Sequence, residues 1–329
     1  MIRILLGFFL IVLLSGCSGN QSALDTHGHS ADALKDLIIL IVAVCTVVWL
    51  LVVGFLLWAL ARKREAPRRD NDAERRMRLS VRVAVAVTAL TVAGLTVASF
   101  TTTRNLNSGN DASLVVRVKA QQWWWQFIYQ DANQQPAFLT ANELHIPVNQ
   151  DVRLELESLD VIHSLWIPSL AGKLDMIPGR KNTITIRATR PGVYRGQCAE
   201  FCGLQHSHMA FVVVAEEEPS YRLWYTAQAA PAAEPTVAEA AAGKTVFMSK
   251  PCAACHTIRG TSASGTSGPD LTHVASRRTI GAGLLETTRG TLAAWIADPQ
   301  TLKPGNNMPL VPLTSNELRQ VSAYMEELK

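Results

Sequence analysis

The sequence predicts a multidomain protein with an N-terminal transmembrane helical hairpin, an all-β domain and a small all-α domain. Three observations support this division. Two long apolar runs lie in the first third of the chain, short alternating segments follow from Ser113, and amphipathic helical patterns fill the C-terminal part. A chain of 329 residues has room for two small folded domains besides membrane segments.

Residues 1–16 are predicted to be a lipoprotein-type signal peptide. Arg3 precedes an apolar stretch from Ile4 to Leu14, and small residues follow it. Residues 14–17, Leu-Ser-Gly-Cys, resemble a bacterial lipoprotein box, which makes Cys17 a candidate for lipidation. The alternative is an uncleaved extra helix with an incidental cysteine.

Residues 17–104 are predicted to form the transmembrane hairpin, with helices over about 37–60 and 79–100. Each run is long enough to cross a hydrocarbon core of about 30 Å. The connecting loop, Arg62–Arg78, holds eight Lys/Arg residues against four acidic ones. By the positive-inside tendency this loop is cytoplasmic, so the two folded domains are predicted to lie on the periplasmic side of a bacterial inner membrane.

Residues 105–226 are predicted to form the all-β domain, an antiparallel sandwich or barrel. Short segments in which apolar and polar residues alternate support it; they are Leu114–Ala120, Glu143–Pro147, Val152–Ser158, Thr183–Ala188 and Met209–Val214. An Ala/Pro-rich stretch at 227–240 then predicts a flexible or semi-extended linker. The final domain, 241–329, is predicted to be helical, with helices around Leu292–Ala297 and Ser315–Leu328.

The all-β domain carries side chains typical of a dinuclear copper centre. Cys198 and Cys202 are spaced to bridge two ions, and one imidazole on each ion, a thioether and a backbone carbonyl complete a set that suits copper; these ligands come from His163, Glu200, His206 and Met209. A disulfide between the two cysteines is the alternative, because the segment is predicted to be extracytoplasmic. The His and Met that follow Cys202 favour copper.

The helical domain contains Cys252-Ala253-Ala254-Cys255-His256, the pattern of a c-type haem attachment site. The two thiols would bind the haem covalently and His256 would be an axial iron ligand. Met308, in a turn-rich loop between two helical stretches, is the candidate for the second axial ligand. Weaker candidates are Met248, Met325 and His273, and zinc binding or a redox dithiol are the alternatives for the motif.

Five motifs give the chain a specific resemblance; they are Gln122–Phe127, Asp160–Ser164, Asp175–Arg180, Cys198–Met209 and Gly268–His273. Together with the hairpin they resemble subunit II of a bacterial haem-copper cytochrome c oxidase, of the caa-type that carries a fused cytochrome c. The resemblance implies a cupredoxin-like fold for the all-β domain and a cytochrome c fold for the helical one.

The resemblance also implies roles that the residues alone do not. Glu200 would bind copper through its main-chain carbonyl, and its carboxylate would reach a magnesium ion at the interface with subunit I. Trp123 would match an exposed aromatic residue at which electrons enter the copper domain, although packing at the membrane interface also explains a tryptophan there. The Pro269 carbonyl would orient the His256 ring, with a simple turn role as the alternative.

The predicted function is electron relay from a cytochrome c or another periplasmic donor through haem c and copper to subunit I, which reduces oxygen to water and pumps protons. Subunits I and III and the membrane are the expected partners, and no nucleic acid is expected. A nitric-oxide or nitrous-oxide reductase subunit with a similar copper centre is the nearest alternative. A copper-delivery or assembly protein, from another class, would need neither His163 nor a covalent haem.

Overall fold

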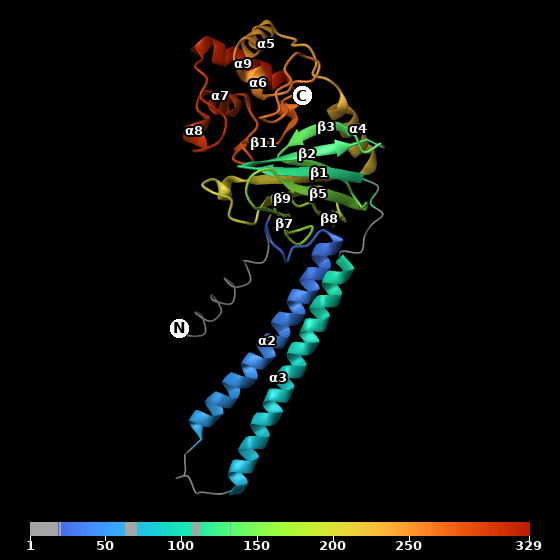
Figure 1. Ribbon diagram of the computed structural model, residues 1–329, viewed down its shortest axis with the longest axis vertical. Coiled ribbons are helices and arrows are strands. Elements are labelled where there is room, and N and C mark those ends of the chain that lie inside the picture. The colour runs from blue at the N-terminus through green and yellow to red at the C-terminus, as the bar shows by residue number, and fades with distance from the viewer. Residues whose placement is uncertain (1–18, 20, 63–70, 107–111, 113, 132) are drawn as a thin grey trace, which may run out of the picture. The chain divides into compact units, whose positions relative to one another are not determined.

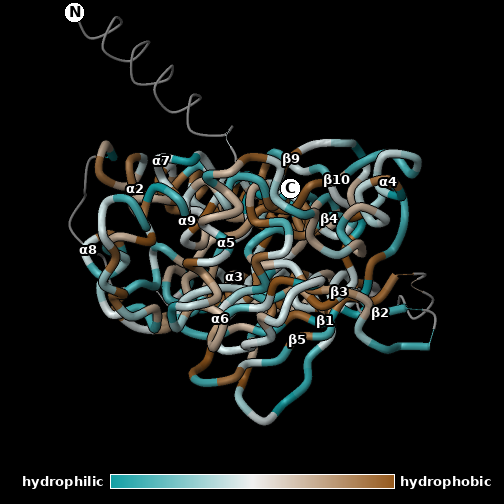
Figure 2. The backbone as a smooth tube through the Cα atoms, turned by 90° about the horizontal axis from the view of Figure 1, so that it is seen from above, coloured by the Kyte–Doolittle hydropathy of each residue, from teal (hydrophilic) through white to brown (hydrophobic). Residues whose placement is uncertain are grey.

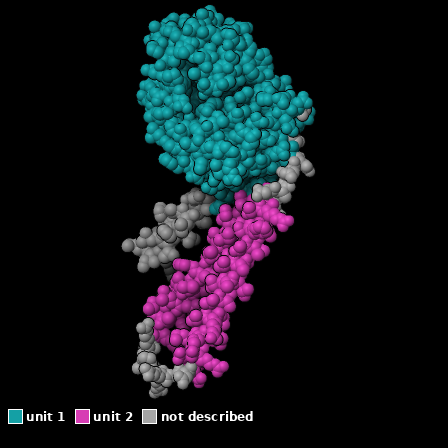
Figure 3. Space-filling view, in the orientation of Figure 1, with its two compact units in different colours: residues 1–31, 109–329 teal, residues 32–108 magenta. Residues whose placement is uncertain are grey.

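The computed structural model describes residues 19, 21–62, 71–106, 112, 114–131 and 133–329. The chain divides into two compact units, one of residues 32–108 and the other of residues 1–31 with 109–329 (Figure 3). The predicted signal peptide and Cys17 lie outside the described residues.

Two long helices make up the smaller unit, α2 (His29–Ala61) and α3 (Asn71–Leu106) (Figure 1). Both are long and apolar enough to cross a membrane. Apolar side chains such as Trp49, Phe55 and Leu90 are exposed along them, which is unfavourable in water and expected in lipid. Each helix is longer than its apolar run, because polar residues continue the helix beyond it.

The larger unit begins with a sandwich of two five-stranded sheets. One sheet has the order β3-β2-β1-β5-β8, formed by Pro136–Ala141, Trp124–Gln130, Leu114–Gln121, Val152–Ser158 and Asn182–Ile186. The other has the order β4-β10-β9-β6-β7, formed by Glu143–Pro147, Ala210–Glu216, Gly192–Cys198, His163–Trp166 and Leu174–Met176. Apolar stretches run through these strands, as the brown segments near β3 and β10 in Figure 2 show.

The prediction of an all-β domain is confirmed, but the antiparallel arrangement predicted for its sandwich or barrel was wrong for two strand pairs. β1 pairs with β5 in parallel, and β10 pairs with β4 in parallel, while the other pairings in the two sheets are antiparallel. Parallel neighbours need a long connection, and here three intervening strands provide it between β1 and β5. Alternation of side chains predicts that a segment is a strand but not the direction of its partner.

Aromatic side chains fill the interior of the sandwich. Trp125, Phe127 and Tyr129 alternate along β2 and are fully buried. Trp125 and Phe127 each contact the Phe211 ring, with centroids 5.1 and 5.5 Å apart. Buried aromatics of this size contribute much of the apolar burial that holds two sheets together. The same core includes Cys198, Cys202 and Met209, at and within the connection from β9 to β10.

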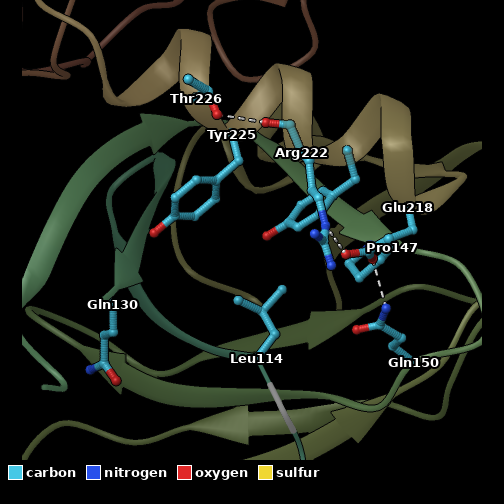
Figure 4. A pocket seen from close by; sticks show the side chains of 9 residues that line it. Leu114, Gln130, Pro147, Gln150, Glu218, Arg222, Tyr225 and Thr226 are labelled. Carbon is cyan, nitrogen blue, oxygen red and sulfur yellow. Dashed lines mark hydrogen bonds and ion pairs between the residues drawn. The ribbon is translucent and has the colours of Figure 1, made fainter. Parts of the chain in front are cut away.

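Helix α4 (Glu218–Ala229) follows β10 and covers one part of the sandwich. Its Trp224 ring stacks on His145, with centroids 4.0 Å apart and planes at 5°. An open pocket with a mixed polar and apolar lining lies between α4 and the strand ends; Figure 4 shows Leu114, Gln130, Pro147, Gln150 and Arg222 among its lining residues. Leu114 and Gln121 are opposite ends of β1, so this pocket is at the far end of the strand from the aromatic turn that follows Gln121.

The helical domain contains α5 (Ala238–Ser249), α6 (Cys252–Cys255), α7 (Arg289–Ala297), α8 (Pro299–Leu302) and α9 (Ser315–Glu327). The helical prediction is confirmed for these elements. It missed one small hairpin, β11 (Thr279–Ile280) with β12 (Leu285–Glu286). Gly281, Ala282 and Gly283 have φ of 65°, 65° and 82°, and this left-handed turn reverses the chain.

The Ala/Pro stretch between α4 and α5 lies against the helical domain. Arg259 Nη1 donates to Ala229 O at 2.9 Å, and the Ala232 N–H donates to Arg259 O at 2.9 Å. Thr236 binds the Glu327 carboxylate of α9 through its N–H and its hydroxyl, at 2.7 and 2.9 Å. These bonds hold in place part of the stretch that the composition predicted to be a flexible or semi-extended linker.

Candidate metal centres

The loop between β9 and β10 carries five of the six predicted copper ligands. β9 ends at Cys198, a short 3-10 turn spans His206–His208, and β10 starts at Ala210. The Cys198 N–H donates to Met209 O at 2.9 Å and so closes the base of the loop. Gly203, with φ of 112°, allows the chain to turn back within it. The loop is therefore held at the ends of two inner strands of the sheet, β9 and β10.

The predicted side chains converge in this loop. Cys198 Sγ and Cys202 Sγ lie 3.7 Å apart, and Cys202 Sγ lies 3.6 Å from His206 Nδ1 and 3.8 Å from Met209 Sδ. On the other side, Cys198 Sγ lies 3.8 Å from His163 Nδ1 and 3.2 Å from Glu200 O. Cys198, Cys202, Met209 and His163 are all buried.

Both cysteines are free thiols in the structure, at a separation far beyond the S–S bond length of about 2.05 Å. The disulfide alternative is therefore not the arrangement seen here. Ligand atoms of His163, Cys198 and Cys202 all lie within 4.8 Å of one another. A buried set of thiol, imidazole and thioether groups at these distances fits a pair of soft or borderline metal ions, as copper requires.

The two thiols interact electrostatically. A hydrogen bond from Cys202 lowers the pKa of Cys198 to about 3, against the opposing effect of burial and with further help from His163. The pKa of Cys202 is raised, because a second thiolate beside Cys198 would be repelled and is also desolvated.

His163 reaches the site from β6, in the same sheet as the loop. Its ring is fully buried, and Nε2 lies 2.8 Å from Asp160 Oδ1. This contact leaves Nδ1 directed at Cys198. Burial acts to lower the pKa of His163, but hydrogen bonds with Cys198 and Asp160 outweigh it, and the pKa is raised.

Asp160 is a site residue that the sequence analysis did not single out. Besides holding His163, its Oδ2 accepts the Gln122 N–H at 2.7 Å. It thus joins the His163 segment to the turn that precedes β2. The sequence did contain a signal for this role, because Asp160 is a carboxylate three residues before the candidate ligand His163, within the Asp160–Ser164 motif.

Trp123 lies beside the loop, and its Nε1 donates to Cys202 O at 2.9 Å. The expectation of an exposed aromatic residue was wrong: Trp123 is only 8% exposed. Main chain from the helical domain covers it, since a methyl group placed on Gly305 would lie 3.6 Å from Trp123 Cη2. Residues distant in sequence therefore decide whether this ring meets solvent.

The haem attachment motif forms the short helix α6 and the residue after it. Cys252 and Cys255 are free and half-buried, and burial raises the pKa of Cys252. His256 Nδ1 lies 2.8 Å from Pro269 O, so Nδ1 carries the proton and Nε2 is left for a metal. The predicted Pro269 contact is confirmed. Two thiols with an imidazole oriented this way fit a covalently bound haem.

The Pro269 loop lies tightly against α6 and His256. Gly268 N donates to Cys255 O at 2.8 Å, and a methyl group on Gly268 would lie 2.5 Å from His256 Cε1. Gly265 is equally constrained, because a methyl group there would lie 2.3 Å from Ala254 O. Because Gly268 has no side chain, the loop backbone can lie against the His256 ring. Because Gly265 has none, the same loop can lie against the main chain of α6.

Hydrogen bonds hold the main chain of Met308, the predicted second axial ligand. Met308 lies in the loop between α8 and α9; its N–H donates to Asn306 Oδ1 and its carbonyl accepts from Gln300 Nε2, at 2.8 and 2.9 Å. Its pairing with His256 stays a prediction. The three weaker candidates are engaged elsewhere, as Met325 packs in the helical core, Met248 Sδ contacts Ser262, and both ring nitrogens of His273 bind carbonyls.

A two-sheet domain with a CuA-like His/Cys/Met site, a helical domain with a c-type haem motif and two apolar helices define a membrane-bound electron-transfer protein. Residues 132–216 match the periplasmic domain of cytochrome c oxidase subunit II, and residues 240–329 match cytochrome c. The chain belongs to the cytochrome c oxidase subunit II family, in the form with a fused cytochrome c domain. The first domain implies CuA and the second implies haem c.

Several individual proteins are similar to this chain. The cytochrome c oxidase subunit 2 of Alkalihalophilus pseudofirmus is 33% identical over 333 residues, which cover 98% of this chain and 95% of that protein. The subunit 2 of Bacillus sp. strain PS3 is 33% identical over 66% of this chain and 63% of its own length. The periplasmic domain of the Bradyrhizobium japonicum subunit is 28% identical over 36% of this chain and 94% of that domain, with a TM-score of 0.34.

Proposed function

We propose that this chain receives electrons for a haem-copper terminal oxidase and relays them from a covalent haem c, through a dinuclear copper centre, to the subunit that reduces oxygen to water and translocates protons. The observation that carries the proposal is the convergence of two free thiols, a thioether and the His206 imidazole of the loop between β9 and β10 with the buried His163 imidazole of β6. When bound, copper and haem supply one-electron carriage.

In the proposed copper site, Cys198 and Cys202 bridge the two ions. His163 and His206 each provide Nδ1, Met209 provides its thioether, and Glu200 provides its main-chain carbonyl. Asp160 holds the His163 ring, and the bond between Cys198 N and Met209 O closes the loop. A site whose ligands are fixed before the metal changes charge needs little rearrangement during electron transfer.

In the proposed haem site, Cys252 and Cys255 form the thioether links, and His256 and Met308 are the axial ligands. Pro269 O keeps the His256 ring oriented and leaves Nε2 free for iron. A histidine and methionine pair saturates the iron and raises its potential, which favours electron transfer over oxygen binding.

The Glu200 carboxylate is proposed to bind magnesium at the interface with subunit I. Its main-chain carbonyl is directed at Cys198, so the side chain remains available for a second, hard cation. The half-buried position of Glu200 is compatible with a site completed by another subunit. Loss of this cation in a Glu200→Ala protein, with copper retained, is the expected result.

We further propose that both folded domains lie on the periplasmic face of a bacterial inner membrane. The Arg-rich segment between the two apolar helices favours the cytoplasmic side, which puts the rest of the chain outside. Subunits I and III are the proposed membrane partners, and a cytochrome c or a similar haem protein is the proposed donor. Lipidation of Cys17 is proposed from its sequence context.

The deciding experiment is metal analysis of the full chain, purified from membranes of a host that attaches c-type haem. Copper, iron and protein are measured in wild type, Cys198→Ser and Cys202→Ser. Cys45→Ser is the matched control, because Cys45 is a free, exposed cysteine in α2 and far in sequence from the loop. Visible spectra of the same samples report the copper–thiolate bands.

Wild type and the Cys45 control are expected to hold two copper ions for each haem iron. Each single serine variant is expected to lose the dinuclear spectrum while keeping its iron. One copper ion for each iron in wild type would indicate a mononuclear site and contradict the bridging role of the two thiolates. Iron without copper would contradict the copper relay altogether.

A further inference from the structure

Lys303 is a buried lysine between the helical domain and the copper loop. It directly follows α8 and is only 2% exposed. Its ammonium group donates to three backbone carbonyls, Trp123 O at 2.8 Å, His208 O at 2.7 Å and Gly281 O at 2.8 Å. An ammonium has three N–H donors, so each one has an acceptor and the charge is compensated inside the protein.

The three carbonyls come from separate parts of the chain. Trp123 belongs to the turn before β2, whose indole binds Cys202 O. His208 lies within the copper loop, between His206 and Met209. Gly281 is in the turn between β11 and β12 of the helical domain itself. One side chain therefore joins two segments of the helical domain to two segments beside the copper ligands.

Main-chain contacts surround this lysine on both sides. Gln205 Nε2, from the copper loop, donates to Pro304 O at 2.9 Å. The Ala210 N–H, at the start of β10, donates to Ala282 O at 3.0 Å. Gly305, with φ of 82°, lies against Leu204 and Trp123 without a side chain to separate them. Because hydrogen bonds are directional, they fix one position of the helical domain relative to the copper loop, which an apolar contact alone would not do.

The same loop leads to the proposed haem ligand through a continuous set of hydrogen bonds. Asn306 Nδ2 donates to Lys303 O at 2.7 Å, and Asn306 Oδ1 accepts the Met308 N–H at 2.8 Å. Gln300 binds both Asn306 O and Met308 O, at 2.8 and 2.9 Å. Fixing Lys303 on the copper domain thus also fixes the segment that carries Met308.

We propose that Lys303 is a positioning residue that holds the Met308 loop on Trp123 and the copper loop, so that electrons reach the copper centre only through this chain's own haem. The inference rests on the proposed function. In the step concerned, the ferrous haem iron loses one electron and becomes ferric, and the copper pair gains that electron. No bond forms or breaks. An external donor meets the haem domain, because the Trp123 ring is covered.

Stability alone does not explain a lysine at this position. Burial lowers the pKa of Lys303 to about 7, which reflects the cost of removing an ammonium group from water. An apolar side chain of similar length would avoid that cost but would leave the three carbonyls without this donor. The lysine instead supplies directional bonds to three main-chain segments, and its geometry defines where the haem loop lies.

The test uses the assembled oxidase with Lys303→Met, which keeps the length of the side chain and removes its three donors. Lys250→Met is the matched control, because Lys250 pairs with Glu317 within the helical domain, at 2.9 Å. A laser flash with a soluble photoreductant reduces the haem, and absorbance follows its reoxidation by copper. Steady-state turnover with a soluble cytochrome c gives kcat and KM.

Lys303→Met is expected to slow haem-to-copper transfer about tenfold or more, as misplacing reacting centres by about 1 Å can do. Reduction of the haem by the external cytochrome is expected to be unchanged, so kcat/KM stays constant while kcat and KM fall together. The control should match wild type. An unchanged internal rate in Lys303→Met with full copper and haem content would overturn the proposal and leave the proposed function intact.

A second measurement needs no variant. Hydroxyl-radical footprinting of the wild-type oxidase should leave Trp123 protected, whereas the 76% exposed Phe201 of the copper loop is open to labelling unless a partner subunit covers it. Labelling of Trp123 at the rate of a freely accessible tryptophan would overturn the proposal even if Lys303→Met fails to fold. Copper and iron are measured on the same wild-type sample, and a missing metal there would contradict the proposed function instead.

Discussion

At the scale of single residues, the copper site depends on groups that do not touch the metal. Asp160 illustrates this, because it holds the His163 ring by one oxygen and the Gln122 main chain by the other. The ring of a metal-binding histidine is commonly fixed by a carboxylate on its second nitrogen, which also raises the basicity of the first. The charge on Asp160 is therefore as important as its shape.

Replacing Asp160 by asparagine tests this role. Asp160→Asn preserves the size of the side chain but removes its charge, so we expect copper to be retained about ten- to hundredfold more weakly. Competition with a copper chelator, followed by the visible spectrum, measures the change. Asp151→Asn is the control, because Asp151 pairs with Arg187 on the surface at 2.8 Å. Equal retention in both variants would show that the carboxylate charge has no part in copper binding.

His145 provides a pH-dependent contribution to the stability of the sandwich. Its two ring nitrogens lie 2.9 Å from Glu143 Oε1 and 2.7 Å from Glu216 Oε2. Burial alone would lower the pKa of His145, but the two carboxylates reverse this and raise the pKa above 6.5. A histidine with a raised pKa binds its proton more tightly in the folded state. Its stabilisation is complete below the unfolded value of 6.5 and disappears as the pH rises through the folded pKa.

We therefore expect His145→Gln to destabilise the protein more at pH 6 than at pH 8.5, by about 1 kcal/mol for each unit of pKa shift. Urea unfolding at several pH values between these limits, followed by tryptophan fluorescence, measures the difference. The exposed His29, changed to glutamine, is the control. If the loss of stability in His145→Gln does not depend on pH, His145 stabilises the fold through its stacking on Trp224 and not through its charge.

At the scale of secondary-structure elements, the haem domain depends on the close crossing of α5 and α9. Gly243 makes this possible, because a methyl group there would lie 2.0 Å from Gln320 O of α9. Phe247 and Tyr324 pack beside the crossing, with ring centroids 6.1 Å apart. Helices that approach this closely are held by contacts between main chains, and any added volume must separate them.

Gly243→Ala is expected to destabilise the haem domain by about 1–3 kcal/mol, although alanine is the better helix former. The expected observable is a lower midpoint of thermal unfolding, measured by haem absorbance. Gly290→Ala, in the first turn of α7, is the matched control, since only Thr288 Oγ1 lies near it, at 3.9 Å. If both variants are equally stable, the crossing is not tightly packed.

Some strands were predictable from the sequence; β5 has one buried face and so alternates, whereas β4 is a short segment buried along its whole length. The predicted segments Glu143–Pro147 and Val152–Ser158 coincide with β4 and β5, and β5 alternates between buried and half-buried residues along its whole length. The strands β6 and β7 span four and three residues, which is too short for a periodicity to be detected. Their places depend on hydrogen bonds to β9 and to each other.

The candidate sites show the same division. Ligands such as Cys198 and His256 were predicted because cysteine and histidine at fixed spacings have few other uses. Lys303 and the burial of Trp123 were missed, because a lysine in a turn normally predicts exposure and the ring is covered by residues far away in sequence. Contacts between residues so far apart in the sequence depend on how the two domains meet, and local sequence patterns do not predict this.

At the scale of the whole molecule, the copper and haem domains of the larger unit are linked by main-chain contacts at several points. Glu143 Oε2 accepts the Arg278 N–H at 2.8 Å while its other oxygen binds His145. On the linker side, Arg259 and His273 of the haem domain bind carbonyls at the end of α4 and beyond it. Separation of the domains would leave several buried groups without partners, which is costly.

We expect the two domains to unfold in one thermal transition, in which the haem Soret band and the copper–thiolate absorbance change together. Removing Lys303 takes away two hydrogen bonds that cross the contact, those to Trp123 O and His208 O, so Lys303→Met should separate the two midpoints by about 2–4 °C for each kcal/mol of coupling lost. Lys250→Met should leave them coincident. Two well-separated midpoints in wild type would show that the two domains unfold independently. The contact would then fix their relative position without coupling their stability.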